Sequence, residues 1–157
     1  MNWQEVCDDR HLRNLPFKIE LNQYGQVVMS PVKVYHSAFQ GRIGTLLYEL
    51  LGIYVLDECA IATLKGTKVA DVAWASPQRF QIVREEDECS IAPEICVEVI
   101  SSSHSKREIR EKIALYFSQG ALECWTCDEH GKMTFYAPDG LLEQSILAPD
   151  FPVNVDL

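Results

Sequence analysis

The sequence predicts a single α/β domain, residues 1–157, in which helices flank a mixed β-sheet. Segments with strand-like and helix-like hydrophobic periodicity alternate along the chain, and glycine turns separate neighbouring strands. One further run, residues 95–100, is apolar except for a single glutamate, which is typical of a central strand covered on both faces. A chain of 157 residues has the length of one domain, and it contains no internal repeat or linker that would divide it.

The first half of the chain predicts a short helix, a hairpin, a long helix and two more strands. Asn2–Glu5 resembles a capping box and marks the start of the first helix, and the turn Asn22–Gly25 separates the hairpin strands. Apolar residues at helical spacing predict the long helix, which Gly52 ends, and Gly66 forms the next turn. The predicted ranges are 17–29 for the hairpin, 37–51 for the helix, and 53–63 and 68–75 for the strands.

The second half predicts two helices and three strands. Ser76 followed by Pro77 is typical of a helix start, and residues 84–88 form a charged, solvated loop. A second capping box, Ser105–Glu108, opens the last helix. The predicted ranges are 95–100 for the central strand, 105 to about 120 for the helix, 122–127 and 133–136 for two strands around His130-Gly131, and a short tail from 141.

The charge and the termini limit the classes of function. There are 14 Lys and Arg against 23 Asp and Glu, so the net charge of -9 argues against binding nucleic acid by global charge alone, although a local basic patch stays open. The N-terminus lacks the basic and apolar regions of a secretory signal, and no apolar run approaches the length of a membrane span. We therefore expect a cytoplasmic protein without membrane contact.

The six cysteines are scattered, and Cys59 and Cys96 lie inside apolar, strand-like runs. This pattern predicts reduced, buried thiols. The Cys124-Trp125-Thr126-Cys127 spacing leaves a zinc knuckle or a redox pair open as an alternative. Because this segment reads as a strand, however, its two cysteines should point to opposite faces of the sheet, which favours buried thiols.

Three acidic residues interrupt apolar strands. Asp71 lies within Val69–Trp74, where it should share a face with Val69 and Ala73, and Glu98 lies in the predicted central strand. Buried carboxylates are costly unless they are paired or bind a cation, and oxygen ligands suit Mg²⁺ or Mn²⁺. Glu58 lies on a third strand, where an exposed or salt-bridged carboxylate is the simpler interpretation. The same interpretation remains open for the other two.

Polar residues also fall on the inward faces of the two long helices. His36 and Gln40 lie within the apolar arc of the first, and Lys112 lies at the margin of the buried stripe of the second, near Tyr116. Lys106, on the opposite margin, is a competing candidate. The structural alternatives are a core or capping role for His36 and, for Lys112, a lysine stem that covers apolar surface.

The order and spacing of these residues resemble the PD-(D/E)XK nuclease superfamily, and most closely its Uma branch of restriction-endonuclease-like proteins. The likeness extends from the hairpin to the end of the chain. The segments that carry it are Gly25–Pro31, Lys68–Trp74, Ala92–Ser101, Lys112 with Tyr116, and Gly120–Trp125.

The resemblance implies a restriction-endonuclease-like core preceded by an N-terminal hairpin, and hydrolysis of DNA phosphodiester bonds. It implies that Asp71 and Glu98 hold Mg²⁺ or Mn²⁺ and that Lys112 supplies the positive charge of the superfamily lysine, with Tyr116 holding Lys112 in place. The supporting residues that it implies are His36, Gln40, Glu58, Ser101 and Tyr116.

Two departures from the superfamily pattern matter. Ala70 stands where proline usually precedes the aspartate, and Ile100 stands where the E-x-K element would have its lysine. The second departure favours an alternative function, a nuclease-fold module without turnover that binds nucleic acid or a partner protein. Hydrolysis of another phosphate substrate is a third possibility, and superfamily analogy allows a homodimer.

Overall fold

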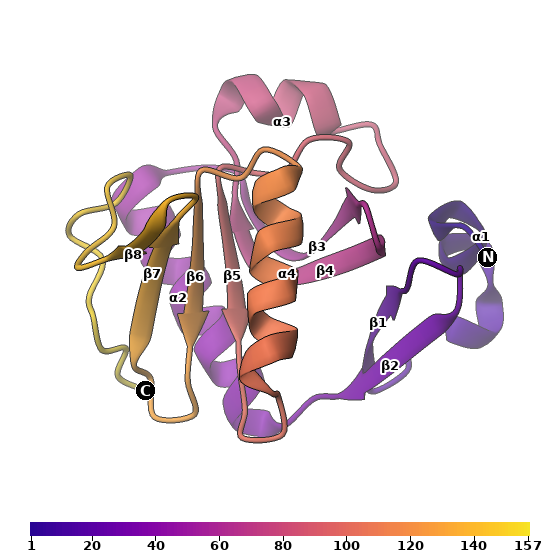
Figure 1. Ribbon diagram of the computed structural model, residues 1–157, viewed down its shortest axis with the longest axis horizontal. Coiled ribbons are helices and arrows are strands. Elements are labelled where there is room, and N and C mark those ends of the chain that lie inside the picture. The colour runs from indigo at the N-terminus through magenta and orange to yellow at the C-terminus, as the bar shows by residue number, and fades with distance from the viewer.

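The computed structural model describes residues 1–157 as a six-stranded mixed sheet with helices on both faces and a separate two-stranded hairpin (Figure 1). Helix α2 lies behind the sheet in this view, and α4 lies in front of it. The helices are α1 (Trp3–Asp8), α2 (Val34–Leu51), α3 (Pro77–Val83) and α4 (Lys106–Ser118), with a 3-10 turn at Arg10–Leu12. The strands are β1 (Phe17–Leu21), β2 (Val27–Pro31), β3 (Val55–Thr63), β4 (Gly66–Trp74), β5 (Ile95–Val99), β6 (Glu123–Cys127), β7 (Met133–Ala137) and β8 (Gly140–Leu142).

The large sheet has the strand order β3-β4-β5-β6-β7-β8. Its neighbours are antiparallel except β5 and β6, which are parallel and are joined through α4. A parallel pair needs such a crossover, because a short turn can only reverse the chain. Every residue of β5 and β6 is buried, as the apolar run at 95–100 predicts for a strand covered on both faces.

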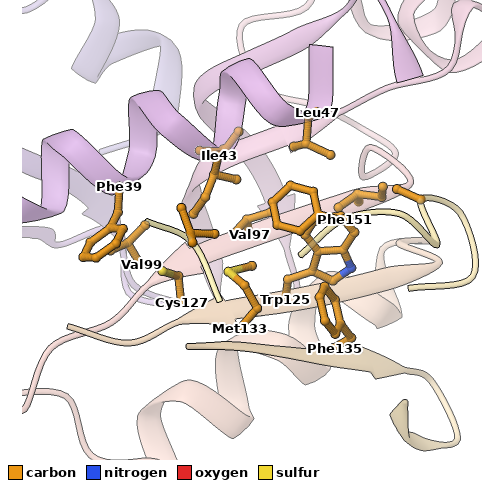
Figure 2. Packing of buried hydrophobic residues seen from close by; sticks show 14 residues of the cluster. Phe39, Ile43, Leu47, Val97, Val99, Trp125, Cys127, Met133, Phe135 and Phe151 are labelled. Carbon is orange, nitrogen blue, oxygen red and sulfur yellow. The ribbon is translucent and has the colours of Figure 1, made fainter. Parts of the chain in front are cut away.

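On the α2 side, large side chains form the first core. Phe39, Ile43 and Leu47 of α2 pack against the sheet, where Trp125 and Phe135 lie edge to face with ring centroids 5.1 Å apart (Figure 2). Phe151, in the C-terminal segment, closes this core. Burial of each such aliphatic or aromatic side chain contributes about 1.5–3 kcal/mol, so this layer fixes α2 on the sheet.

On the α4 side, the second core is built from smaller side chains. It contains Ile113 and Tyr116 of α4, several alanines and four cysteines. Cys124 belongs to this core and Cys127 to the core under α2, so the prediction that the two point to opposite faces is confirmed. All six cysteines are free, and only Cys7 is exposed.

The predicted elements are present, with differences at their ends. The Asn2 capping box is confirmed in both directions, and Ser105 caps α4 by accepting a hydrogen bond from the Glu108 N–H. Helix α2 begins three residues earlier than predicted, at Val34, because Lys33 at its N-cap makes no side-chain capping hydrogen bond and gives no start signal. The predicted tail contains one more strand, β8, which pairs with β7 at the sheet edge. No helix in the structure is long and apolar enough to cross a membrane.

The hairpin β1–β2 packs through β1 against β4. The Glu20 carboxylate accepts a hydrogen bond from the Val69 N–H at 2.7 Å, and Lys68 Nζ donates to the Leu21 carbonyl oxygen at 3.2 Å. Gly66 also lies against the Leu21 and Asn22 carbonyls, so closely that a β-carbon there would clash with both. These contacts bring the side chains of β1 to the middle of β4.

Candidate functional site

The structure brings Asp71 and Glu98 together where β4 and β5 separate. Only Val72–Trp74 of β4 pair with β5, so the two strands diverge at Asp71. The Asp71 carboxylate occupies the resulting gap, where its Oδ2 accepts a hydrogen bond from the Val99 N–H at 2.8 Å. Both acids are buried, with 1% of Asp71 and 4% of Glu98 exposed. The sheet therefore opens at the point where the two carboxylates face each other.

The backbone of β4 departs from regular alternation at the same place. Ala70 and Ala73 pack in the same core, although residues three apart on a regular strand point to opposite faces. Regular alternation is therefore interrupted between these two residues, next to Asp71. Across the ladder from Asp71, Glu58 has a left-handed backbone with φ of 48° and an exposed side chain. The kink turns Asp71 toward β5 and leaves Glu58 outside the site.

A lysine from the hairpin lies between the two carboxylates. Lys18 Nζ is 3.1 Å from Asp71 Oδ1 and 3.0 Å from Glu98 Oε2, and only 11% of its side chain is exposed. Glu20 points to the same region from the same face of β1. Sequence analysis missed both residues. Their signal was the alternation of charged and apolar residues along β1, which puts Lys18 and Glu20 on one face.

Helix α4 supplies a second lysine to Glu98. Lys112 Nζ lies 2.7 Å from Glu98 Oε1 and 2.7 Å from Glu20 Oε2. Tyr116, fully buried one turn further along, donates its hydroxyl hydrogen to Glu98 Oε1 at 2.8 Å. Tyr116 therefore fixes the carboxylate, whereas the resemblance implied that it holds the lysine. Lys106 is exposed and does not line the pocket described below.

The other residues that the resemblance implied lie at different distances from this cluster. His36 Nε2 is 3.3 Å from Asp71 Oδ2, while its Nδ1 is buried without a hydrogen-bond partner. Ser101 lines the pocket and hydrogen-bonds within its own loop, through its N–H to His104 Nδ1 and through its hydroxyl to Ser103. Gln40, one turn along α2 from His36, does not line the pocket.

Burial and the neighbouring charges shift the pKa values of Asp71 and Glu98. Burial opposes ionisation of Asp71, but the Lys18 ammonium and the His36 ring hold the pKa of its carboxyl far below the usual range. The contact with Asp71 in turn raises the pKa of His36 despite partial burial. Burial raises the pKa of Glu98, because desolvation outweighs the attraction of Lys112 and Lys18. The two acids thus have unequal proton affinities, as expected for neighbouring carboxylates in a site.

A pocket of about 520 Å³ opens beside the carboxylates. Asp71, Glu98 and their partners form its wall, and the hairpin and α4 form its sides. Its outer lining is mixed in charge, with lysines from the N-cap of α2, from the β3–β4 turn and from β4, and acids from α4. These lining residues are Lys33, Lys65, Lys68, Glu108 and Glu111.

Buried carboxylates on neighbouring central strands, with a lysine from the following helix, define a restriction-endonuclease-like protein. The chain belongs to the Uma2 family, which is described as "Putative restriction endonuclease" and whose model matches residues 4–154. A search of the curated proteins found no match. Among solved structures, the chain is similar to a putative nuclease belonging to DUF820 from Anabaena variabilis ATCC 29413. The two share 18% sequence identity with a TM-score of 0.71 over 98% of this chain and 94% of the other, which shows a common fold.

Proposed function

We propose that the protein is a metal-dependent endonuclease that hydrolyses DNA phosphodiester bonds. The observation that carries the proposal is the convergence of Asp71 Oδ1 and Glu98 Oε2 on one cation position at the wall of the pocket. Buried acids that converge in this way repel each other unless a cation lies between them. Membership of a family described as restriction endonucleases supports the same chemistry.

The donor set suits Mg²⁺ or Mn²⁺. Both ions prefer oxygen ligands, and Mg²⁺ sites commonly use one or two carboxylates together with water and substrate phosphate oxygens. The structure contains no group of three or more His, Cys, Asp or Glu side chains that could hold a metal. Because Asp71 and Glu98 converge on one position, we expect these two to be the side-chain ligands, with water and phosphate completing the coordination. A bound ion of this kind polarises a phosphodiester and lowers the pKa of a coordinated water.

The chain's own residues position the reactants around these ligands. His36 fixes the Asp71 carboxylate from α2, and Tyr116 fixes Glu98 from α4. Lys112 brings a positive charge to the edge of the pocket, where it would stabilise charge that develops on a phosphate. In this proposal Lys112 replaces the E-x-K lysine, whose position is taken by Ile100, and Lys106 has no role.

The pocket rim offers a local attraction for DNA despite the net charge of -9. Lys33 and Lys65 are exposed on the rim, and Lys68 is half-buried beside them. Such a patch attracts phosphates over about 8–10 Å at moderate salt, so binding should weaken as salt rises. The homodimer that the resemblance allows stays a prediction, which light scattering on the purified protein tests.

Nicking of supercoiled plasmid tests the proposal directly. We expect the wild type to nick DNA with Mg²⁺ or Mn²⁺, to stop when the metal is chelated, and to lose activity in Asp71→Asn. Asp57→Asn is the matched control, because Asp57 is an exposed carboxylate on the neighbouring strand β3. Equal nicking by wild type and Asp71→Asn, or nicking that survives chelation, would contradict the proposal.

One observation favours a second candidate, a nuclease-fold module without turnover. The charges of the site are already paired internally, since Lys18 and Lys112 neutralise the acids without any added ion. A module of this kind would bind DNA or a partner and would show no metal-dependent nicking. Salt-sensitive DNA binding that is equal in wild type and Asp71→Asn, without cleavage, would establish it.

A further inference from the structure

The ammonium group of Lys18 occupies the position that a metal bound by Asp71 and Glu98 would take. It lies about equally far from one oxygen of each acid, at 3.1 and 3.0 Å. Lys112 differs, because it contacts the other oxygen of Glu98 and a carboxylate oxygen of Glu20. Lys18 alone bridges the pair.

The charge balance of the cluster disfavours binding of a divalent cation while the Lys18 ammonium group stays in place. Three carboxylates, from Glu20, Asp71 and Glu98, face two ammonium groups, from Lys18 and Lys112, with the His36 ring beside them. A divalent cation added to this set would face a positive charge at contact distance in a poorly solvated site. Such repulsion is strong where water cannot screen it. Removal of one ammonium group restores the balance.

The exchange requires movement of a side chain only. The backbone of β1 is held on β4 by the Glu20 contact with the Val69 N–H and by the Lys68 contact with the Leu21 carbonyl. The lysine stem, by contrast, is flexible, and Lys18 already lines the pocket of about 520 Å³ into which its end can turn. An exposed acid of α4, Glu108, lines the same pocket and offers the displaced ammonium group a carboxylate.

We propose that Lys18 is a resident counter-ion that exchanges with a divalent cation between Asp71 and Glu98. This inference rests on the proposed function, because it needs the metal site of that proposal. Without metal, the lysine offsets part of the negative charge of the acid pair, and it lowers the affinity of the site for metal. Once displaced, its ammonium group stays in the pocket, on the side from which a phosphate would approach.

Titration with Mn²⁺, followed by the electron paramagnetic resonance signal of the free ion, measures the competition. We expect Lys18→Met to bind Mn²⁺ at least about 10-fold more tightly than the wild type. Lys18→Arg, which keeps the charge, should bind as weakly as the wild type. Lys106→Met is the control, because Lys106 is an exposed lysine that does not line the pocket.

Chemical labelling of the wild type gives a second measurement that does not depend on a variant that folds. An amine-acetylating reagent followed by mass spectrometry should find Lys18 protected without metal and at least about 10-fold more reactive with Mn²⁺, as expected for a group released from buried ion pairs. Lys68 is the internal reference. Mn²⁺ binding that leaves Lys18 protected, or equal Mn²⁺ affinity in wild type and Lys18→Met, overturns the exchange but leaves the proposed metal site intact. No Mn²⁺ binding by either protein overturns both.

Discussion

Two buried glutamates on the adjacent parallel strands β5 and β6 have opposite surroundings. Glu98 is 4% exposed and contacts the Lys18 and Lys112 ammonium groups and the Tyr116 hydroxyl at the wall of a pocket. Glu123 is 2% exposed and lines no described pocket. It accepts hydrogen bonds from neutral donors only, namely Trp125 Nε1, the Ser145 hydroxyl, and the Ile146 and Leu147 N–H groups.

The difference is between a carboxylate with a structural role and one that we propose binds a metal. Three of the donors to Glu123 belong to residues 145–147, which follow β8. Glu123 therefore anchors this segment to the sheet. The partners of Glu98 include two lysines with flexible stems, Lys18 and Lys112, and both line the pocket. Burial of a charge alone therefore does not identify the site. The kind of partner and the neighbouring pocket do.

The largest expected effect is on the nicking rate, and it comes from substitution of Glu98. Glu98→Gln removes a proposed metal ligand and should lower plasmid nicking by at least about 100-fold, because a catalytic metal contributes several kcal/mol to the transition state. Glu123→Gln, on the neighbouring strand, should keep wild-type nicking per folded molecule. Equal losses in both variants would show that burial, and not the site, accounts for the effect.

Lys112→Met is next in size. The loss of its charge beside Glu98 should lower the nicking rate by about 100-fold, which is the scale of removing one electrostatic stabiliser from an active site. Lys106→Met, at the exposed start of the same helix, should leave the rate within about 2-fold, the limit set by weak surface charges. The opposite pattern would assign the role to Lys106.

The anchoring role of Glu123 is tested by the free energy of unfolding. Glu123→Ala leaves two buried and two partly buried donors without their acceptor, and we expect the free energy of unfolding to fall by about 3 kcal/mol. Urea denaturation followed by tryptophan fluorescence measures this, since Trp125 is one of the donors. A loss below about 0.5 kcal/mol, the scale of an ordinary surface substitution, would remove the anchoring role.

Tyr116→Phe tests whether the Tyr116 hydroxyl orients the Glu98 carboxylate. The variant keeps the ring and loses one hydrogen bond to the proposed ligand. Metal affinity should fall by about 10-fold, as is usual when a partner of a metal ligand is removed. Calorimetric titration with Mn²⁺ gives the affinity, and a value equal to that of the wild type would mean that Lys112 alone orients the carboxylate.

The smallest effect concerns the thiols of the two cores. Burial raises the pKa of Cys127 to about 12, so this thiol stays protonated and unreactive at pH 8. With five cysteines buried and Cys7 exposed, a disulfide reagent should find one fast thiol in the native protein and six after unfolding. Fast reaction of Cys124 or Cys127 would instead reopen a redox role for this pair.

The sequence predicted the two acids because each interrupts an apolar strand, a local signal that needs no tertiary information. Lys18 and Glu20 were not predicted, because their role depends on the packing of β1 against β4, a long-range contact that hydrophobic periodicity does not encode. For Glu58 the simpler interpretation was an exposed or salt-bridged carboxylate, and its side chain is exposed on β3, where its backbone is left-handed. Because the E-x-K lysine is missing, the resemblance implied a lysine on the next helix, where Lys112 contacts Glu98; its catalytic role stays a prediction.

The effect of Mg²⁺ on thermal stability tests most directly whether Asp71 and Glu98 form a metal site. At ten times its Kd, a metal bound only by the folded state should raise the Tm of the wild type by about 3–6 °C for a chain of this size. Glu123→Gln should show the same shift from its own baseline, and Glu98→Gln should show none. An equal shift in Glu98→Gln, or no shift in the wild type, would contradict a metal site formed by Asp71 and Glu98.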